Sequence, residues 1–209
     1  MKIADMKVTE LINAVGSDAP APGGGGGAAM AGALAAALAS MVANLTIGKE
    51  KFAECEPEVK ELLKQAEAER VRLLTLVDED AAVFNSFMSC YKLPKTTDEE
   101  KAARTAAIRA AAKQAATVPL NIARSSFAVL KLADRLVVAG NPGVITDGAC
   151  SGLLARAALR CAEYNVRINL GLTKDEAWNA QAAADLKQLL ADAEALETRL
   201  LAVTDKALQ

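Results

Sequence analysis

Apolar residues recur every three or four positions along most of the chain, and no alternating strand pattern extends beyond a few residues. This spacing predicts amphipathic helices. We expect seven of them, over residues 5–15, 28–47, 57–92, 97–117, 120–139, about 147–170, and from a capping segment at 173–176 to about 206. Pro119 is expected to separate the fourth helix from the fifth, because proline lacks the N–H that a continuous helix needs.

The helix expected at 28–47 carries no charged residue and consists mostly of alanine. Its length would suffice for a membrane span. Alanine is nearly neutral for membrane insertion, however, and Ser40, Asn44 and Thr46 add a cost. We therefore interpret this segment as the buried centre of a bundle or a subunit interface. A monomer of 209 residues has difficulty covering such a helix on every side, so a homodimer is expected.

Composition supports an all-α fold, a bundle of about seven helices that forms one domain over residues 1–209. Hydrophobic residues make up 52% of the chain but aromatic residues only 3%, and alanine, the strongest helix former, dominates. The net charge of -2 and the lack of a strongly basic segment argue against a nucleic-acid partner. The N-terminus has no hydrophobic signal core, which predicts a cytoplasmic protein without a membrane partner.

The chain contains no histidine, and its four cysteines form no C-x-x-C pair. No metal site is expected from this set of residues. The cysteines are interpreted as small buried hydrophobes in a reducing compartment, at Cys55, Cys90, Cys150 and Cys161. Acid–base chemistry near neutral pH must then use a carboxylate, lysine, tyrosine or cysteine with a shifted pKa.

Asp80 is the carboxylate whose position is most unusual. Helical periodicity places it in the apolar stripe of its helix, alongside Leu73 and Phe87, whereas Asp78 and Glu79 point away from that stripe. A carboxylate in apolar surroundings is costly unless it is paired, and desolvation raises its pKa toward a range useful for proton transfer. A structural aspartate in a buried ion pair fits the same pattern equally well.

The run Gly23–Gly27 precedes the apolar helix. Glycines allow close backbone approach, and the free N–H groups at a helix start attract anions. The run is neither a Walker loop, since no G-K-[ST] follows, nor a dinucleotide-binding turn, since no strand precedes it. A flexible turn between two closely crossing helices is the alternative.

Four further polar residues are candidates for binding. Asn165 and Asn169 share one helical face and need partners, which are backbone groups of another helix or the edge of a heterocyclic ligand. Asp147 follows a turn and fits helix N-capping as well as binding. Lys49 follows the apolar helix, where it either complements the helix dipole or meets an anionic substrate tail.

Four segments occur in a fixed order along the chain. They are PAPGGGGGAAMAGALAAALASMVANLTIGKEKF, VDEDAAVFNSFMSCYKLPKTTDEEKAAR, TVPL and GNPGVITDGACSGLLARAALRCAEYNVRINL. Together they resemble the cyclodeaminase/cyclohydrolase family of folate enzymes over essentially the whole chain. The segments NLTIGK and NPGVITD are more similar to the free-standing bacterial methenyltetrahydrofolate cyclohydrolases than to the cyclodeaminase domain of bifunctional enzymes.

The resemblance implies an all-helical, dimeric enzyme that uses no metal or redox cofactor. It implies that Asp80, the second aspartate of a V-D-x-D motif, is the catalytic acid. The glycine run, Lys49 and Asp147 match further family motifs, although Thr146 stands where the family has serine. We assign substrate binding to Gly23, Gly24, Gly25, Gly26, Lys49, Asp147, Asn165 and Asn169.

The reaction expected from the resemblance is reversible hydrolysis of 5,10-methenyltetrahydrofolate to 10-formyltetrahydrofolate. One alternative is the formimidoyltetrahydrofolate cyclodeaminase reaction, which releases ammonia. The other is a folate-binding helical protein without catalytic activity.

Overall fold

The structure, a computed structural model, describes residues 2–209, and within that range it contains α-helices and short 3-10 turns but no strand. The predicted all-α fold is therefore confirmed. The α-helices are α1 (Val8–Val15), α2 (Gly24–Asn44), α3 (Glu56–Cys90), α4 (Asp98–Ala139), α5 (Ile145–Thr173) and α6 (Glu176–Ala207). The 3-10 turns are η1 (Ile3–Asp5), η2 (Glu50–Phe52) and η3 (Pro142–Val144).

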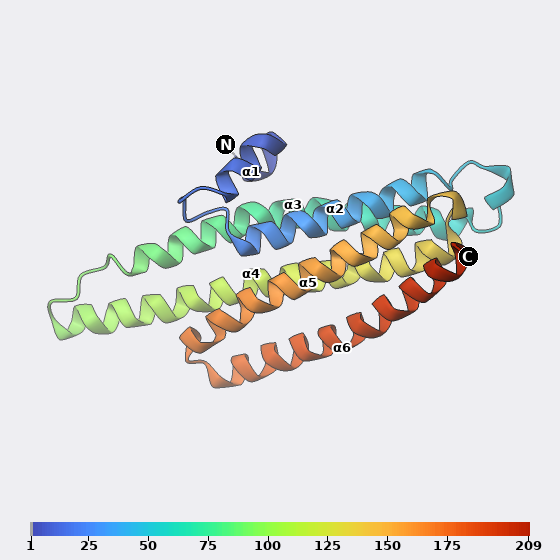
Figure 1. The fold of residues 1–209 in the computed structure, drawn as a ribbon. Coiled ribbons are helices and arrows are strands. Elements are labelled where there is room, and N and C mark those ends of the chain that lie inside the picture. The colour runs from blue at the N-terminus through green and yellow to red at the C-terminus, as the bar shows by residue number, and fades with distance from the viewer. Residues whose placement is uncertain (1) are drawn as a thin grey trace.

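Helices α2, α3, α4 and α5 run up and down in a ring, and α6 packs in the groove between α4 and α5 (Figure 1). The short α1 lies to one side of this bundle. Helices α3, α4 and α5 all continue past the start of α2, and α3 and α4 extend beyond the end of α5. Beyond the start of α2, the ring therefore consists of three helices instead of four.

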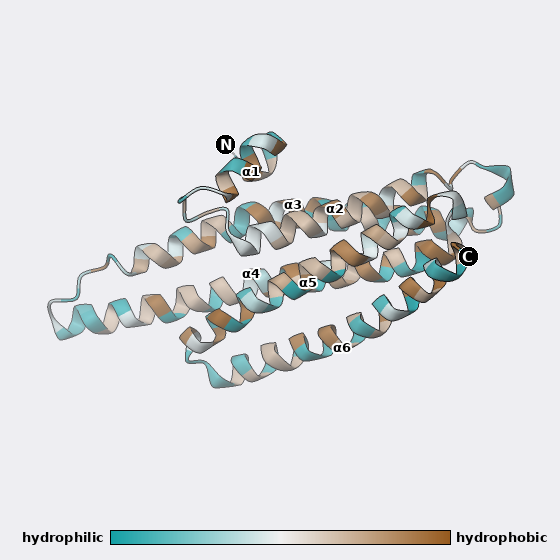
Figure 2. Cartoon of the chain, viewed as in Figure 1, coloured by the Kyte–Doolittle hydropathy of each residue, from teal (hydrophilic) through white to brown (hydrophobic). Residues whose placement is uncertain are grey.

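Helix α2 packs closely against the other helices of the ring because its side chains are small. A Cβ at Gly32 would lie 3.0 Å from the Ser126 hydroxyl oxygen and 3.1 Å from the Leu73 side chain. Figure 2 shows mostly white and pale brown along α2 up to its last turn, in contrast to the teal that alternates along α6. By length and composition α2 qualifies as a candidate membrane span, but 61% of its most apolar window is buried inside the structure. Core packing accounts for this apolar segment.

Helix α4 runs unbroken from Asp98 to Ala139 with Pro119 buried inside it, so the predicted break at Pro119 is wrong. There are six α-helices instead of the expected seven. Proline 119 cannot donate to the carbonyl of Ala115, four residues earlier. The Nδ2 of Asn169 on α5 donates to that carbonyl at 2.9 Å and replaces the lost bond. A neighbouring helix thus removes part of the cost that the sequence alone assigns to the proline.

Three further predictions concern the start of α4, the start of α2 and the burial of the cysteines. The capping box at Thr97 is confirmed, since Glu100 N–H donates to the Thr97 hydroxyl and the Glu100 carboxylate accepts from Thr97 N–H. Helix α2 begins at Gly24, so most of the glycine run lies inside its first turn instead of in a preceding loop. The prediction that all four cysteines are buried is wrong, because Cys150 and Cys161 on α5 are exposed, Cys55 and Cys90 are half-buried, and all four are free thiols.

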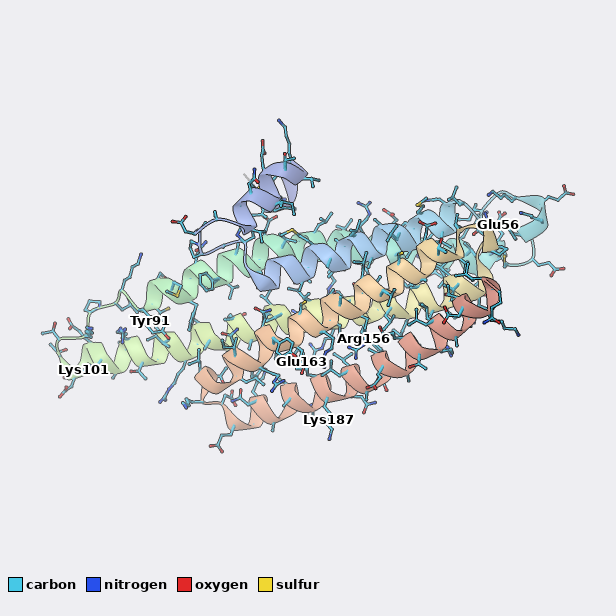
Figure 3. All side chains as sticks on the ribbon, in the orientation of Figure 1. Glu56, Tyr91, Lys101, Arg156, Glu163 and Lys187 are labelled. Carbon is cyan, nitrogen blue, oxygen red and sulfur yellow. The ribbon has the colours of Figure 1, made fainter. Side chains whose placement is uncertain are left out.

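Ion pairs fix α6 to the rest of the bundle. The buried Asp134 of α4 accepts from Arg199 of α6. Arg156 of α5 reaches Glu197 of α6 at 3.3 Å, from the side of α5 that faces α6 (Figure 3). These contacts hold α6 on the side of the bundle away from α2.

Candidate functional site

A cavity of about 330 Å³ lies where α2 begins. Helices α3, α4 and α5 continue past this point, and the cavity occupies the space between them just beyond the first residues of α2. The glycines of the α2 start form its floor, and the three remaining helices form its walls. Its volume is at the lower end of the range of small-molecule sites, so it suits a fused ring system better than a whole elongated ligand.

Asp80 of α3 lies directly over the first turn of α2. A Cβ added to Gly25 would come within 2.7 Å of the Asp80 Cγ, so the carboxylate occupies space that only glycine leaves open. The N–H of Gly26 donates a hydrogen bond to this carboxylate. Close packing therefore explains the glycine at position 25, whereas position 26 contributes only a backbone N–H, which most other residues would also supply.

Burial raises the pKa of Asp80 above its ordinary value, and the hydrogen bond from Gly26 opposes this shift only in part. Asp80 has no salt-bridge partner among the described residues, which removes the alternative of a structural ion pair there. A half-buried, unpaired carboxylate with a raised pKa is suited to accepting and returning a proton.

Asn165 and Asn169 line the wall that α5 contributes. The Nδ2 of Asn165 donates to the Cys161 carbonyl at 2.9 Å, and its amide lies about 3.5 Å from the Cβ position of Gly24. The Nδ2 of Asn169 donates to the carbonyls of Ala115 and Asn165. Asn169 therefore binds a backbone group of another helix, as one alternative expects, whereas Asn165 binds its own helix, and both side chains line the cavity.

The structure brings together Asp80, Gly23, Gly24, Gly25, Asn165 and Asn169 as lining residues, with Gly26 directly behind Asp80. The apolar lining was not predicted from the sequence; it includes Pro20, Ala21, Val83, Phe84, Phe87, Ala115, Val118, Pro119, Ile168 and Leu172. Helical spacing could have identified part of this lining. The positions three, four and seven residues after Asp80 and after Asn165 all line the same cavity. Asp80 is the one charged residue among them.

Lys49 and Asp147 do not lie at this cavity. Lys49 follows the far end of α2, a helix about 30 Å long. Asp147 lies in the first turn of α5, one turn before Ser151, whose hydroxyl donates to the carbonyl of Ala35 in the middle of α2. Asp147 is also not the helix N-cap, which is Val144. Within one chain these two residues are separated from Asp80 by most of the length of α2.

A metal centre is not suggested by the described residues, 2–209, in which no three histidine, cysteine, aspartate or glutamate side chains are grouped as ligands.

Comparisons with known proteins agree with these features. A family model described as formiminotransferase-cyclodeaminase matches residues 7–188. The chain is 43% identical over 193 residues to a methenyltetrahydrofolate cyclohydrolase of Methylorubrum extorquens, covering 92% of this chain and 93% of that protein. It is 34% identical to the formimidoyltransferase-cyclodeaminase of Sus scrofa over 87% of this chain, but it spans only 34% of that longer protein.

The fold is matched by a crystal structure of formiminotetrahydrofolate cyclodeaminase from Thermotoga maritima. The TM-score is 0.89, the sequence identity is 27%, and the match covers 100% of both chains. The chain therefore belongs to the formiminotransferase-cyclodeaminase family.

Proposed function

We propose that this protein hydrolyses 5,10-methenyltetrahydrofolate to 10-formyltetrahydrofolate, with Asp80 as the general acid and base. The observation that supports this most strongly is the unpaired Asp80 carboxylate, held over the glycine start of α2 in a cavity with no other charged group. The 43% identity to a cyclohydrolase over nearly the full length of both proteins supports the same reaction.

The substrate carries a cationic amidinium carbon between N5 and N10, and a single carboxylate can serve each step of its hydrolysis. Asp80 stabilises the cation and accepts a proton from water as the water oxygen bonds to that carbon. It returns the proton to N5 as the carbon–N5 bond breaks, and the hydroxyl proton of the intermediate passes to solvent. The formyl group remains on N10, and one proton is released overall.

The cavity is large enough for the reacting ring system but not for the complete substrate. We propose that the pterin and the amidinium ring occupy it and that the glutamate tail extends outside. Asp80, the α2 glycines and the two asparagines would then contact the ring system. The folate derivative is the substrate, and the proposed reaction needs no cofactor. We further propose that residues 1–209 act as one domain in the cytoplasm, without a nucleic-acid or membrane partner.

The alternative activity is the cyclodeaminase reaction, which forms the same amidinium cation as ammonia leaves. It is favoured by the Thermotoga maritima structure and by the 34% identity to the pig enzyme. The same carboxylate could protonate the departing ammonia.

A two-substrate assay tests the proposal. Purified protein is given 5,10-methenyltetrahydrofolate, with its near-UV absorbance followed, and separately formimidoyltetrahydrofolate, with ammonia release followed. We expect acceleration of methenyl hydrolysis and a kcat/KM at least tenfold higher than for ammonia release. The reverse preference would assign the chain to the cyclodeaminases, and no acceleration of either reaction would leave only a non-catalytic folate-binding role.

We propose in addition that the protein is a homodimer joined through the outer face of α2 and α5. On α5 uncharged residues recur every three or four positions and remain exposed, at Cys150, Leu153, Ala157, Cys161, Tyr164 and Ile168. Leu34 and Met41 continue this face on α2. The large side chains expose on the order of 500 Å² of apolar surface, at the upper end for a monomer. A stable interface uses roughly 800 Å² per partner, which a second copy of this face would complete.

In this dimer, Lys49 and Asp147 of one subunit would lie near the cavity of the other subunit. In such a dimer the α2–α5 faces of the two subunits contact each other across a two-fold axis perpendicular to the helices. The helices of the two faces then run in opposite directions. The far end of α2 in the partner subunit then approaches the cavity of this chain. We propose that the two residues contribute to binding in this way, where a lysine would meet the anionic glutamate tail outside the cavity.

Substituting Leu34 by glutamate is expected to convert the dimer to a monomer at micromolar concentration. The substitution buries an unpaired charge twice, once from each copy, in an apolar interface. Val71→Glu on α3 is the matched control, because Val71 is 57% exposed and Leu34 is 56% exposed, but Val71 lies off the α2–α5 face. Sedimentation velocity reports both. A wild-type monomer, or a monomer produced by Val71→Glu as readily as by Leu34→Glu, would contradict this interface.

A further inference from the structure

Pro119 and Asn169 form a pair that links the helix backbone of α4 to the wall of the cavity. Pro119 is buried in the middle of α4 and has no N–H, so the Ala115 carbonyl has no donor within its own helix. Asn169 on α5 donates to that carbonyl from Nδ2 at 2.9 Å. Pro119, Ala115 and Asn169 all line the cavity beside Asp80.

The orientation of the Asn169 amide follows from its partners. Its Nδ2 donates at 2.9 Å to the Ala115 carbonyl and at 2.8 Å to the Asn165 carbonyl, and both oxygens can only accept. Both N–H groups of the amide are therefore used, and the flipped amide would place its oxygen against two other oxygens. The Oδ1 atom is the polar atom of Asn169 that remains for a ligand.

The polar side chains of the cavity consequently present acceptors. Asp80 presents a carboxylate, and Asn169 presents Oδ1. Asn165 uses one N–H of Nδ2 on the Cys161 carbonyl and keeps both its oxygen and its second N–H for a ligand. Among the described residues, the lining contains no lysine or arginine. Such a wall favours a ligand edge that is rich in N–H donors over an edge that accepts.

We propose that Pro119 is a positioning residue that fixes Asn169 as a hydrogen-bond acceptor, and that Asn169 selects the N–H edge of the pterin, formed by its ring N3–H and 2-amino group. This inference rests on the proposed folate substrate and deepens it. It gives the proline inside α4 a role in specificity, because the carbonyl that it frees is one of the two that orient the amide.

A double-mutant cycle tests the pair. Pro119→Ala restores the helical N–H for the Ala115 carbonyl and releases Asn169 to rotate, so KM for methenyltetrahydrofolate should rise roughly 3- to 10-fold with kcat changed less than twofold. Asn169→Ala should give a rise of similar size. Because both variants remove one oriented acceptor, the double variant should resemble Asn169→Ala instead of showing the product of both effects. Asn121→Ala, an asparagine on α4 outside the cavity, is the control and should leave KM unchanged.

Binding measurements make the test independent of turnover. Calorimetric Kd values are compared for tetrahydrofolate and its 2-desamino analogue in the wild type and in the single variants. Wild type should prefer the amino ligand, and the preference should shrink in both Pro119→Ala and Asn169→Ala. An unchanged preference, or multiplicative effects in the double variant, would overturn the inference. If these results hold while methenyl hydrolysis is absent, the proposed reaction fails and the recognition of the pterin edge stands.

Discussion

Replacing Asp80 by asparagine is expected to lower kcat/KM for methenyltetrahydrofolate by roughly 10²- to 10⁴-fold, the range for loss of a positioned general acid or base. Asparagine matches the shape of aspartate and still offers an oxygen to the Gly26 N–H, but it cannot accept the proton of the attacking water. The loss should appear in kcat, because the amidinium ring still fits the cavity. Steady-state hydrolysis and substrate binding measured on the same preparation separate the two effects.

The same variant should remain folded and be at least as heat-stable as wild type near neutral pH. Burial holds the pKa of Asp80 above its value in the unfolded chain, so the ionised side chain disfavours the native state at neutral pH. Wild type recovers this stability as the pH falls through the native pKa, so the gap between variant and wild type should narrow toward acidic pH. Near-normal turnover by a folded Asp80→Asn would remove Asp80 from the mechanism.

Substituting Gly25 by alanine is expected to have the next largest effect, a loss of about 100-fold in kcat/KM. The added methyl group would overlap the Asp80 carboxylate, which must then move away from the start of α2. A displacement of about 1 Å of a catalytic group is enough for a loss of this size. The measurement is the same hydrolysis assay, with circular dichroism to show that the helices are retained.

Gly27→Ala is the matched control in the same turn of α2. A Cβ at Gly27 meets nothing within 4 Å, and alanine is favoured over glycine in a helix by up to about 1 kcal/mol. This variant should keep wild-type activity and be equally or more stable. If Gly25→Ala and Gly27→Ala behaved alike, contact between Gly25 and Asp80 would not control the site.

The sequence predicted those parts of the fold that depend on local patterns. Periodicity indicated the helices, the Thr97 capping box indicated the start of α4, and the lack of charge in α2 indicated that much of this helix is buried. The break at Pro119 was predicted wrongly, because the compensating donor comes from Asn169, 50 residues later in the sequence. Local sequence patterns do not reveal a hydrogen bond from another helix that replaces the backbone bond lost at proline.

The candidate site was predicted in part for the same reason. Helical phase separates Asp80, which faces the cavity, from Asp78, whose carboxylate accepts from the Ile3 N–H at 2.6 Å and ties η1 to α3. The cavity itself arises because α2 begins beside three helices that continue, a property of their relative placement. Sequence motifs also gave no indication that Lys49 and Asp147 lie far from Asp80 within the same chain.

The pH dependence of kcat/KM for methenyltetrahydrofolate tests most directly whether the buried Asp80 carboxylate is the proton acceptor. Hydrolysis requires the ionised form, and burial raises its pKa, so activity should fall on the acid side with a midpoint above about 3.9, the ordinary value for aspartate. The limb should reach a plateau toward neutral pH. A profile that stays flat down to pH 4, in a protein that remains folded there, would contradict this account.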